Sequence, residues 1–151
     1  MEDSSLRSFT ELKAWQKSRE VRKAISKLVK RFPADEKLRL TDQIVRSSRG
    51  ACANVSEGYG RFHEKDNARF CRMARGSLYE TMDHLSLAFD EGFISKEELK
   101  ANWAMVEEAI RVMNGYLRYL SKVGSPANTA AEPQELYGTD EDIYTDPPED
   151  L

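Results

Sequence analysis

Hydrophobic side chains recur at helical spacing in four stretches of this chain, with polar residues between them. The clearest stretch follows Ser95 and Glu98, which match the capping box that starts many helices. Its seven hydrophobic positions alternate spacings of four and three residues, and they are Leu99, Trp103, Val106, Ile110, Met113, Leu117 and Leu120. This a/d seam predicts a long helix that packs against its neighbours at a shallow angle.

The other three stretches also predict helices, at residues 9–32, 41–60 and 64–89. Thr41 is expected to cap the second helix through its hydroxyl, and Gly92 to end the third. No alternating β pattern lies between the stretches and the connections are short, so neighbouring helices must run in opposite directions. We therefore predict an all-α fold, an antiparallel up-down four-helix bundle.

Charge divides the chain into two parts. Residues 125–151 hold eight acidic residues, four of the five prolines and no Lys or Arg, so they carry −8 while residues 1–124 carry +5. Such a segment buries too little apolar surface to offset its ordering entropy, which predicts a bundle at 1–124 and a disordered acidic C-terminal tail. As an alternative, the tail docks on a protein partner through its few hydrophobic side chains, which are Leu136, Tyr137, Ile143 and Tyr144.

Composition excludes several classes of protein. The 151 residues, 40% hydrophobic and 32% charged, suit one water-soluble domain. No apolar run approaches the roughly 18–20 residues of a membrane span, and the N-terminus lacks the apolar core of a secretory signal, so we expect a cytoplasmic protein with no membrane partner. Cys52 and Cys71 stand far apart without a CxxC motif, which predicts reduced thiols and no metal site.

Basic residues cluster on the first three predicted helices. Aligned Lys and Arg side chains attract phosphate backbones through counterion release, without reading the base sequence. We therefore expect a surface that binds nucleic acid, RNA or DNA, and the alternative is an ordinary solvated face. The candidate residues are Lys23, Lys27, Lys30, Arg31, Arg46, Arg49, Lys65, Arg69, Arg72 and Arg75.

Polar residues also fall near the apolar faces of the second and third helices. We interpret Asn54, Glu57, Gly76, Ser77 and Glu80 as a buried polar network that fixes helix register, with Gly76 allowing two backbones to approach closely. The alternative is a catalytic carboxylate pair of Glu57 with Glu80. No nucleophile, HExxH, GxSxG or P-loop motif accompanies that pair, so we expect no catalytic residues, no cofactor and no metal.

Five short motifs resemble one known family over residues 9–122. They are Phe9-x-x-Leu12-x-x-Trp15-Gln16, Arg31-Phe32-Pro33-x-x-Glu36, Leu40-x-x-Gln43-Ile44-x-Arg46, Asn54-x-x-Glu57-Gly58-x-Gly60-Arg61 and Ala74-Arg75-Gly76-Ser77-x-x-Glu80. The chain resembles the four-helix bundle family of the 23S rRNA intervening-sequence proteins. The resemblance implies a bacterial, cytoplasmic bundle without established enzymatic activity that assembles as a ring-like homopentamer. A related branch resembles the accessory variability proteins of diversity-generating retroelements, which bind nucleic acid and a reverse transcriptase.

Three functional hypotheses follow. The first is a non-enzymatic homo-oligomer, expected to be a pentamer, that associates with RNA through basic helix faces. The second is a protein-interaction scaffold with the acidic tail as the partner-binding motif. The third is an enzyme that uses Glu57, Glu80 and His84. We favour the first.

Overall fold

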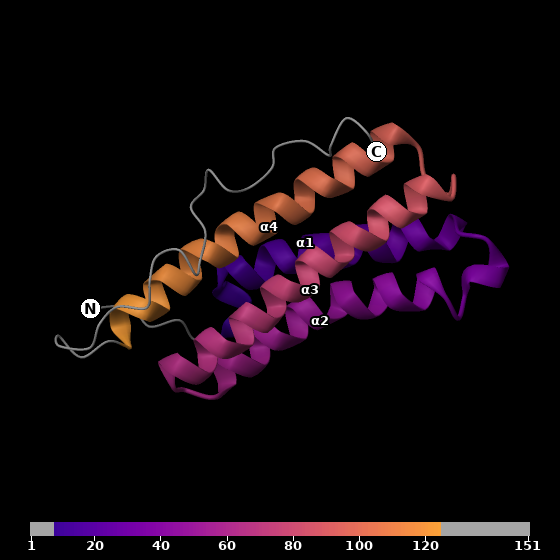
Figure 1. The fold of residues 1–151 in the computed structure, drawn as a ribbon. Coiled ribbons are helices and arrows are strands. Elements are labelled where there is room, and N and C mark those ends of the chain that lie inside the picture. Colours follow the sequence, from indigo (N-terminus) through magenta and orange to yellow (C-terminus); the bar gives the residue numbers. More distant parts are fainter. Residues whose placement is uncertain (1–7, 125–151) are drawn as a thin grey trace.

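The computed structural model describes residues 8–124, and these form four long antiparallel helices (Figure 1). The helices are α1 (Lys13–Leu28), α2 (Leu40–Gly60), α3 (Glu64–Asp90) and α4 (Lys96–Val123). Each helix packs against the next, and α1 also packs against α4, which closes the bundle. The predicted all-α, up-down four-helix bundle is confirmed. The predicted disordered tail lies outside the described residues.

The first predicted helix is divided into three pieces. A 3-10 turn, η1 (Phe9–Glu11), precedes α1, and a second, η2 (Val29–Arg31), follows it. Leu12 separates η1 from α1 because its backbone is extended, with ψ at 125°, while its side chain is buried in the core. The hydroxyl of Ser8 accepts a hydrogen bond from the backbone N–H of Thr10 at 3.2 Å and so caps the 3-10 turn.

The start of α2 differs from the prediction. Arg39 precedes the helix, and its side chain makes no capping hydrogen bond. Instead, a third 3-10 turn, η3 (Ala34–Glu36), brings a carboxylate to the helix start. There Oε2 of Glu36 accepts a hydrogen bond from the N–H of Leu40 at 3.1 Å. The prediction that Thr41 caps this helix is therefore wrong. The carboxylate of Glu36 accepts a hydrogen bond from one of the first N–H groups of the helix, which have no carbonyl partner within the helix.

The fourth helix confirms its prediction closely. Ser95 and Glu98 form the reciprocal capping box, with both hydrogen bonds at 3.1 Å. Gly92, which follows α3, has a φ of +75°, a conformation that glycine adopts without a Cβ penalty. All the seam residues are buried except Trp103, which is half-buried. The seam therefore faces the core, together with Ile25, Ile44 and Leu78.

Small residues bring α2 and α3 together. The hydroxyls of Ser47 and Thr81 lie 2.8 Å apart in the core, joined by a hydrogen bond. A Cβ at Gly50 would lie 3.3 Å from Oγ of Ser77, so the close approach of the two helices occurs at Gly50. The close approach predicted at Gly76 is not found among residues 8–124, because none of their atoms lies within 4 Å of the position of its Cβ.

Figure 1 shows which segments share an end of the bundle. The α1–α2 connection and the α3–α4 turn lie at one end, called here the α1–α2 end. The α2–α3 turn and the C-terminus of α4 lie at the other, called the α2–α3 end. A Cβ at Gly124 would lie 2.9 Å from Cβ of Glu64, so the described chain stops beside the start of α3.

Candidate nucleic-acid interface

Most of the predicted basic residues reach the surface. Six of them lie on α1, η2 and the first half of α2, toward the α1–α2 end, and all six are exposed. These six, called here the α1–α2 basic group, are Lys23, Lys27, Lys30, Arg31, Arg46 and Arg49. Because α1 packs against α2, the structure brings residues that are separated in the sequence onto two neighbouring helices.

Two members of this group contact acidic side chains. Arg31 pairs with Glu98 at the start of α4, and Arg46 lies 3.6 Å from Asp42 on its own helix. Both arginines are exposed, so water screens the two pairs and each contributes little to stability. Within residues 8–124 the remaining four, Lys23, Lys27, Lys30 and Arg49, form no ion pair. These four cations are therefore available to an external anion.

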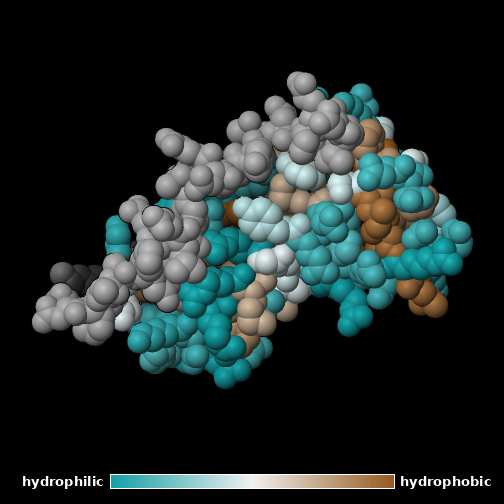
Figure 2. All heavy atoms as spheres, viewed as in Figure 1, coloured by the Kyte–Doolittle hydropathy of each residue, from teal (hydrophilic) through white to brown (hydrophobic). Residues whose placement is uncertain are grey.

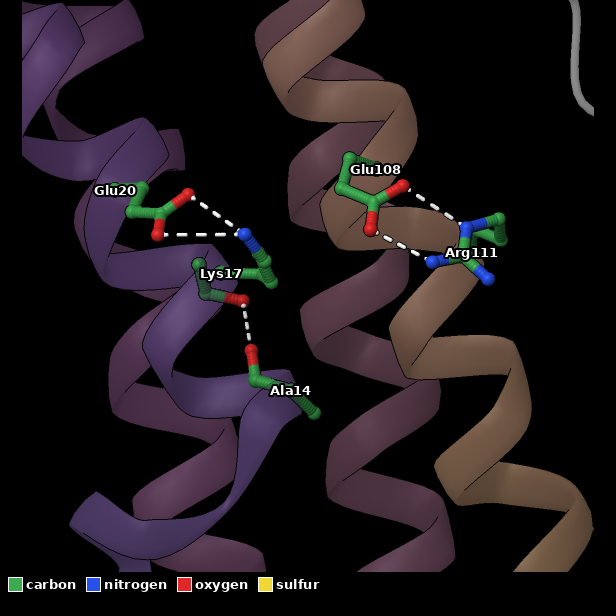
Figure 3. Close-up of polar contacts among 6 residues, drawn as sticks. Ala14, Lys17, Glu20, Glu108 and Arg111 are labelled. Carbon is green, nitrogen blue, oxygen red and sulfur yellow. Dashed lines mark hydrogen bonds and ion pairs between the residues drawn. The ribbon is translucent and has the colours of Figure 1, made fainter.

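The first half of α1 is different because acidic groups offset its charge. Nζ of Lys17 lies 3.2 Å from Glu20, and on neighbouring α4 Arg111 pairs with Glu108 at 2.7 Å (Figure 3). The hydrogen bond from Arg111 lowers the pKa of Glu108, and the charge of Lys17 lowers it further. The net positive character of α1 is thus greatest in its second half.

The four basic candidates on α3 do not form one row. Lys65 and Arg69 are exposed, whereas Arg72 and Arg75 are half-buried. Arg75 donates a hydrogen bond to Oδ1 of Asn114 on α4, at 2.9 Å. The three-residue spacing of Arg69, Arg72 and Arg75 places each of these side chains about 60° behind the last one around the helix, so the row turns from solvent toward α4. Arg75 therefore ties two helices together, a role that the sequence did not predict.

The structure divides the eight exposed candidates between two parts of the bundle. The α1–α2 basic group lies toward one end, and Lys65 with Arg69 lies at the other. Arg49, the member of the α1–α2 basic group that is farthest along α2, lies 11 residues before the end of that helix, or about 16 Å along its axis. Figure 2 shows hydrophilic side chains over most of the visible face, with hydrophobic ones gathered toward the α1–α2 end. One chain therefore presents two basic areas.

The residues predicted as a polar network lie mostly at the surface. Glu57 is exposed and pairs with Arg61 at 3.0 Å, and Glu80 is exposed with Oε1 3.2 Å from Nε2 of His84. Asn54 and Ser77 are half-buried. Neither glutamate is buried in the core, so within this chain they do not form the internal network that the sequence suggested. The described residues contain no group of three or more His, Cys, Asp or Glu side chains able to hold a metal ion.

A different set of polar residues occupies the core at the α2–α3 end. Nδ2 of Asn67 donates a hydrogen bond to the hydroxyl of Tyr116 at 2.9 Å, and Sγ of Cys71 lies 3.5 Å from Oδ1 of Asn67. Burial raises the pKa of Tyr116 to about 12 and that of Cys71 to about 12. The sequence does not single out Asn67, because it resembles any polar residue in the first turn of a helix.

Cys52 and Cys71 are both free, as predicted, and burial raises both thiol pKa values, which makes them poor nucleophiles and ligands.

Several arginine side chains lie against aromatic rings. The guanidinium carbons of Arg19 and Arg22 lie 5.8 and 6.0 Å from the centre of the Trp15 ring on α1. Those of Arg61 and Arg69 lie 5.1 and 4.7 Å from the Phe70 ring at the α2–α3 end. Stacking on a ring leaves the N–H groups of arginine free to bind an anion. Arginines therefore lie against aromatic rings at two places on the molecule, and the Phe70 ring itself is buried.

Comparison with known proteins gives a family match. A family model described as 23S rRNA-intervening sequence protein matches residues 10–115, from η1 into the second half of α4. The matched region contains all ten basic candidates and excludes the acidic segment 125–151. No curated protein matches the chain. Among the described residues, no helix is both long and apolar enough to cross a membrane.

Proposed function

The chain belongs to the 23S rRNA-intervening sequence protein family, and from that premise we propose that it is a non-enzymatic homo-oligomer that associates with RNA. The contacts are made to phosphates by the α1–α2 basic group. They supply affinity without sequence specificity, because the phosphate backbone is the same in every RNA.

The observation that carries this proposal is the set of four cations without acidic partners. Lys23, Lys27, Lys30 and Arg49 are exposed on two packed helices and form no ion pair within residues 8–124. An exposed cation that already has a carboxylate partner gains less from a phosphate than one that has none. Neutralising phosphates with such side chains releases condensed counterions, and this release favours binding at low salt.

The outer face of α3 supports self-association. Met73 and Tyr79 are 48% and 49% exposed, and between them lies Gly76 with open space at the position of its Cβ. An exposed glycine in mid-helix costs about 1 kcal/mol relative to alanine, a cost that close approach of a second subunit would offset. Exposed apolar side chains around a small residue suit a subunit interface. We propose a ring of five, a number that comes from the family resemblance.

The RNA proposal is tested with matched charge reversals in the full chain. One variant changes Lys23, Lys27 and Lys30 to Glu, and the control changes the exposed Lys96, Lys100 and Lys122 of α4 to Glu. Both variants alter the net charge equally, so long-range electrostatic effects are matched. Binding to two unrelated RNAs is measured across a salt titration.

We expect the α1 variant to bind both RNAs more weakly than the α4 control does. Its slope of log affinity against log salt should fall by about two, as expected when roughly three phosphate contacts are lost. Equal losses in both variants would contradict a site on α1. If the unmodified chain binds neither RNA at low salt, the RNA proposal fails and the scaffold hypothesis replaces it.

A further inference from the structure

Phe62 has a backbone conformation that its side chain does not favour. It follows the C-terminus of α2, and its φ of +54° makes it the one non-glycine residue with a positive φ among residues 8–124. Helices commonly end with this left-handed conformation, but glycine usually holds the position because a Cβ there is strained. The chain thus has a phenylalanine where glycine would be more stable.

Packing among residues 8–124 does not explain why phenylalanine occupies this position. Phe62 is 87% exposed, the highest value among the large hydrophobic side chains of residues 8–124. Within the same residues its ring contacts one other ring, that of Tyr59, with the ring centres 6.2 Å apart. Because its side chain buries so little surface, Phe62 contributes almost nothing to the stability of the fold that would offset its backbone strain. Residues with strained backbones concentrate at binding sites. The ring is available to a flat partner from outside the chain.

Two arginines lie at the same turn as Phe62. Arg61 directly precedes it in the chain, and the guanidinium carbons of Arg61 and Arg69 lie 5.1 and 4.7 Å from the centre of a single ring, that of Phe70. Glu57 orients Arg61 through an ion pair at 3.0 Å, whereas Arg69 forms no ion pair within residues 8–124. Arg69 is therefore the cation at this turn that gains most from a phosphate, and Arg61, whose guanidinium lies near the same ring, supplies further N–H donors.

We propose that the α2–α3 turn binds an unpaired nucleotide, with its base stacked on Phe62 and its phosphate held by Arg61 and Arg69. This inference rests on the proposed association with RNA and adds a second, structurally distinct contact. A stacking ring recognises bases that are not paired, and any base offers a flat face. The turn therefore distinguishes single-stranded from duplex nucleic acid, whereas the α1–α2 basic group does not.

The test substitutes Phe62→Gly in the full chain, with Leu38→Gly as the control. Leu38 is 86% exposed in the connection before α2, so the control removes a similarly exposed apolar side chain at the opposite end. Binding is measured at low salt to a 12-nucleotide single-stranded RNA, a single-stranded DNA of the same sequence and a fully paired RNA duplex. A 2-aminopurine base in the single strand reports stacking through its fluorescence.

We expect Phe62→Gly to weaken single-strand binding roughly 5- to 100-fold, as measured for the loss of one aromatic stacking contact. RNA and DNA single strands should be affected alike, and duplex binding should not change. The Leu38→Gly control should bind all three ligands as the unmodified chain does. Phe62→Tyr should retain binding and 2-aminopurine quenching. The thermal midpoint of Phe62→Gly should equal or exceed that of the unmodified chain, which excludes unfolding as the cause.

Other outcomes separate this inference from the proposed function. If the unmodified chain binds single strands and duplex and Phe62→Gly changes neither, the stacking site is refuted and the RNA proposal stands. If Phe62→Gly weakens duplex and single-strand binding equally, Phe62 does not recognise unpaired bases and the inference is also refuted. If the unmodified chain binds no nucleic acid, both proposals fail together.

Discussion

The side-chain amide of Asn67 donates a hydrogen bond to the hydroxyl of Tyr116 over 2.9 Å, which joins α3 to α4. The same Asn67 faces α2, because a Cβ at Gly58 would lie 2.8 Å from its Oδ1 and 3.0 Å from its backbone oxygen. Asn67 therefore links its own helix, α3, to both α2 and α4. It stabilises the α2–α3 end, where both the Phe62 turn and Gly124, the last described residue, are located.

Tyr116 should make the stability of the bundle depend on pH in the alkaline range. Its pKa rises from 10.0 to about 12, chiefly through burial, so folding favours the protonated phenol. The stabilisation is fully present below pH 10 and is lost as the pH rises toward 12. Urea unfolding at a series of pH values should show this loss, and absorbance at 295 nm should show one late-titrating tyrosine.

The variant Tyr116→Phe should lack that late titration and lose about 1 kcal/mol of stability at neutral pH, because Asn67 loses its acceptor. Tyr119→Phe is the control, since Tyr119 is 57% exposed. A Tyr116→Phe variant as stable as the unmodified chain would show that water replaces the hydroxyl at no cost.

Gly58 should not tolerate a side chain. A Cβ there would lie 2.9 Å from Cβ of Phe70, and the nearby backbone oxygen of Asn67 cannot move aside easily. We expect Gly58→Ala to lower the free energy of unfolding by about 1–3 kcal/mol, the usual cost of overpacking. Gly60→Ala is the matched control, because nothing lies within 4 Å of the Cβ position there. Thermal unfolding of both variants checks this, and equal midpoints would contradict it.

The hydrogen bond between Ser47 and Thr81 should couple α2 energetically to α3. Both residues are buried, and their oxygens are 2.8 Å apart. In a double-mutant cycle of Ser47→Ala and Thr81→Val, each single change should cost about 1 kcal/mol, with a coupling of at least ~0.5 kcal/mol. Additive effects would mean that each hydroxyl is satisfied by its own helix, through the carbonyls of Ile44 and Ser77.

The sequence predicted the helices well because local signals determine them. The capping box at Ser95 and the seam that follows it need no knowledge of the rest of the chain. The same holds for Gly92, which ends α3 with a positive φ as expected. The start of α2 was missed because its cap, Glu36, comes from a short 3-10 turn that helical periodicity does not show.

The site was predicted less completely because it depends on how each helix is rotated. Spacing shows which residues share a face, but not which neighbouring helix that face contacts. The close approach was therefore assigned to Gly76 although Gly50 makes it, and Arg75 was assigned to the surface although it contacts Asn114. The strain at Phe62 has no signal in the sequence, because an aromatic residue in a turn shows neither its φ nor its exposure.

The acidic segment 125–151 should weaken the binding of RNA. It follows Gly124, which lies beside Glu64 at the α2–α3 end, and its eight acidic residues are joined to a bundle that carries +5. A tethered polyanion competes with phosphates at high effective concentration. Deletion of 125–151 changes each subunit from −3 to +5.

We expect the truncated chain to bind RNA more tightly than the full chain at low salt. Its affinity should also fall more steeply as salt rises, because more counterions are released when no tail occupies the cations. A full-length control with the eight acids changed to Asn or Gln separates charge from length, and it should behave like the truncated chain. Salt titration of the three proteins against one RNA measures this. If the neutralised tail still weakens binding as the natural one does, the effect is steric, and electrostatic competition by the acidic segment is wrong.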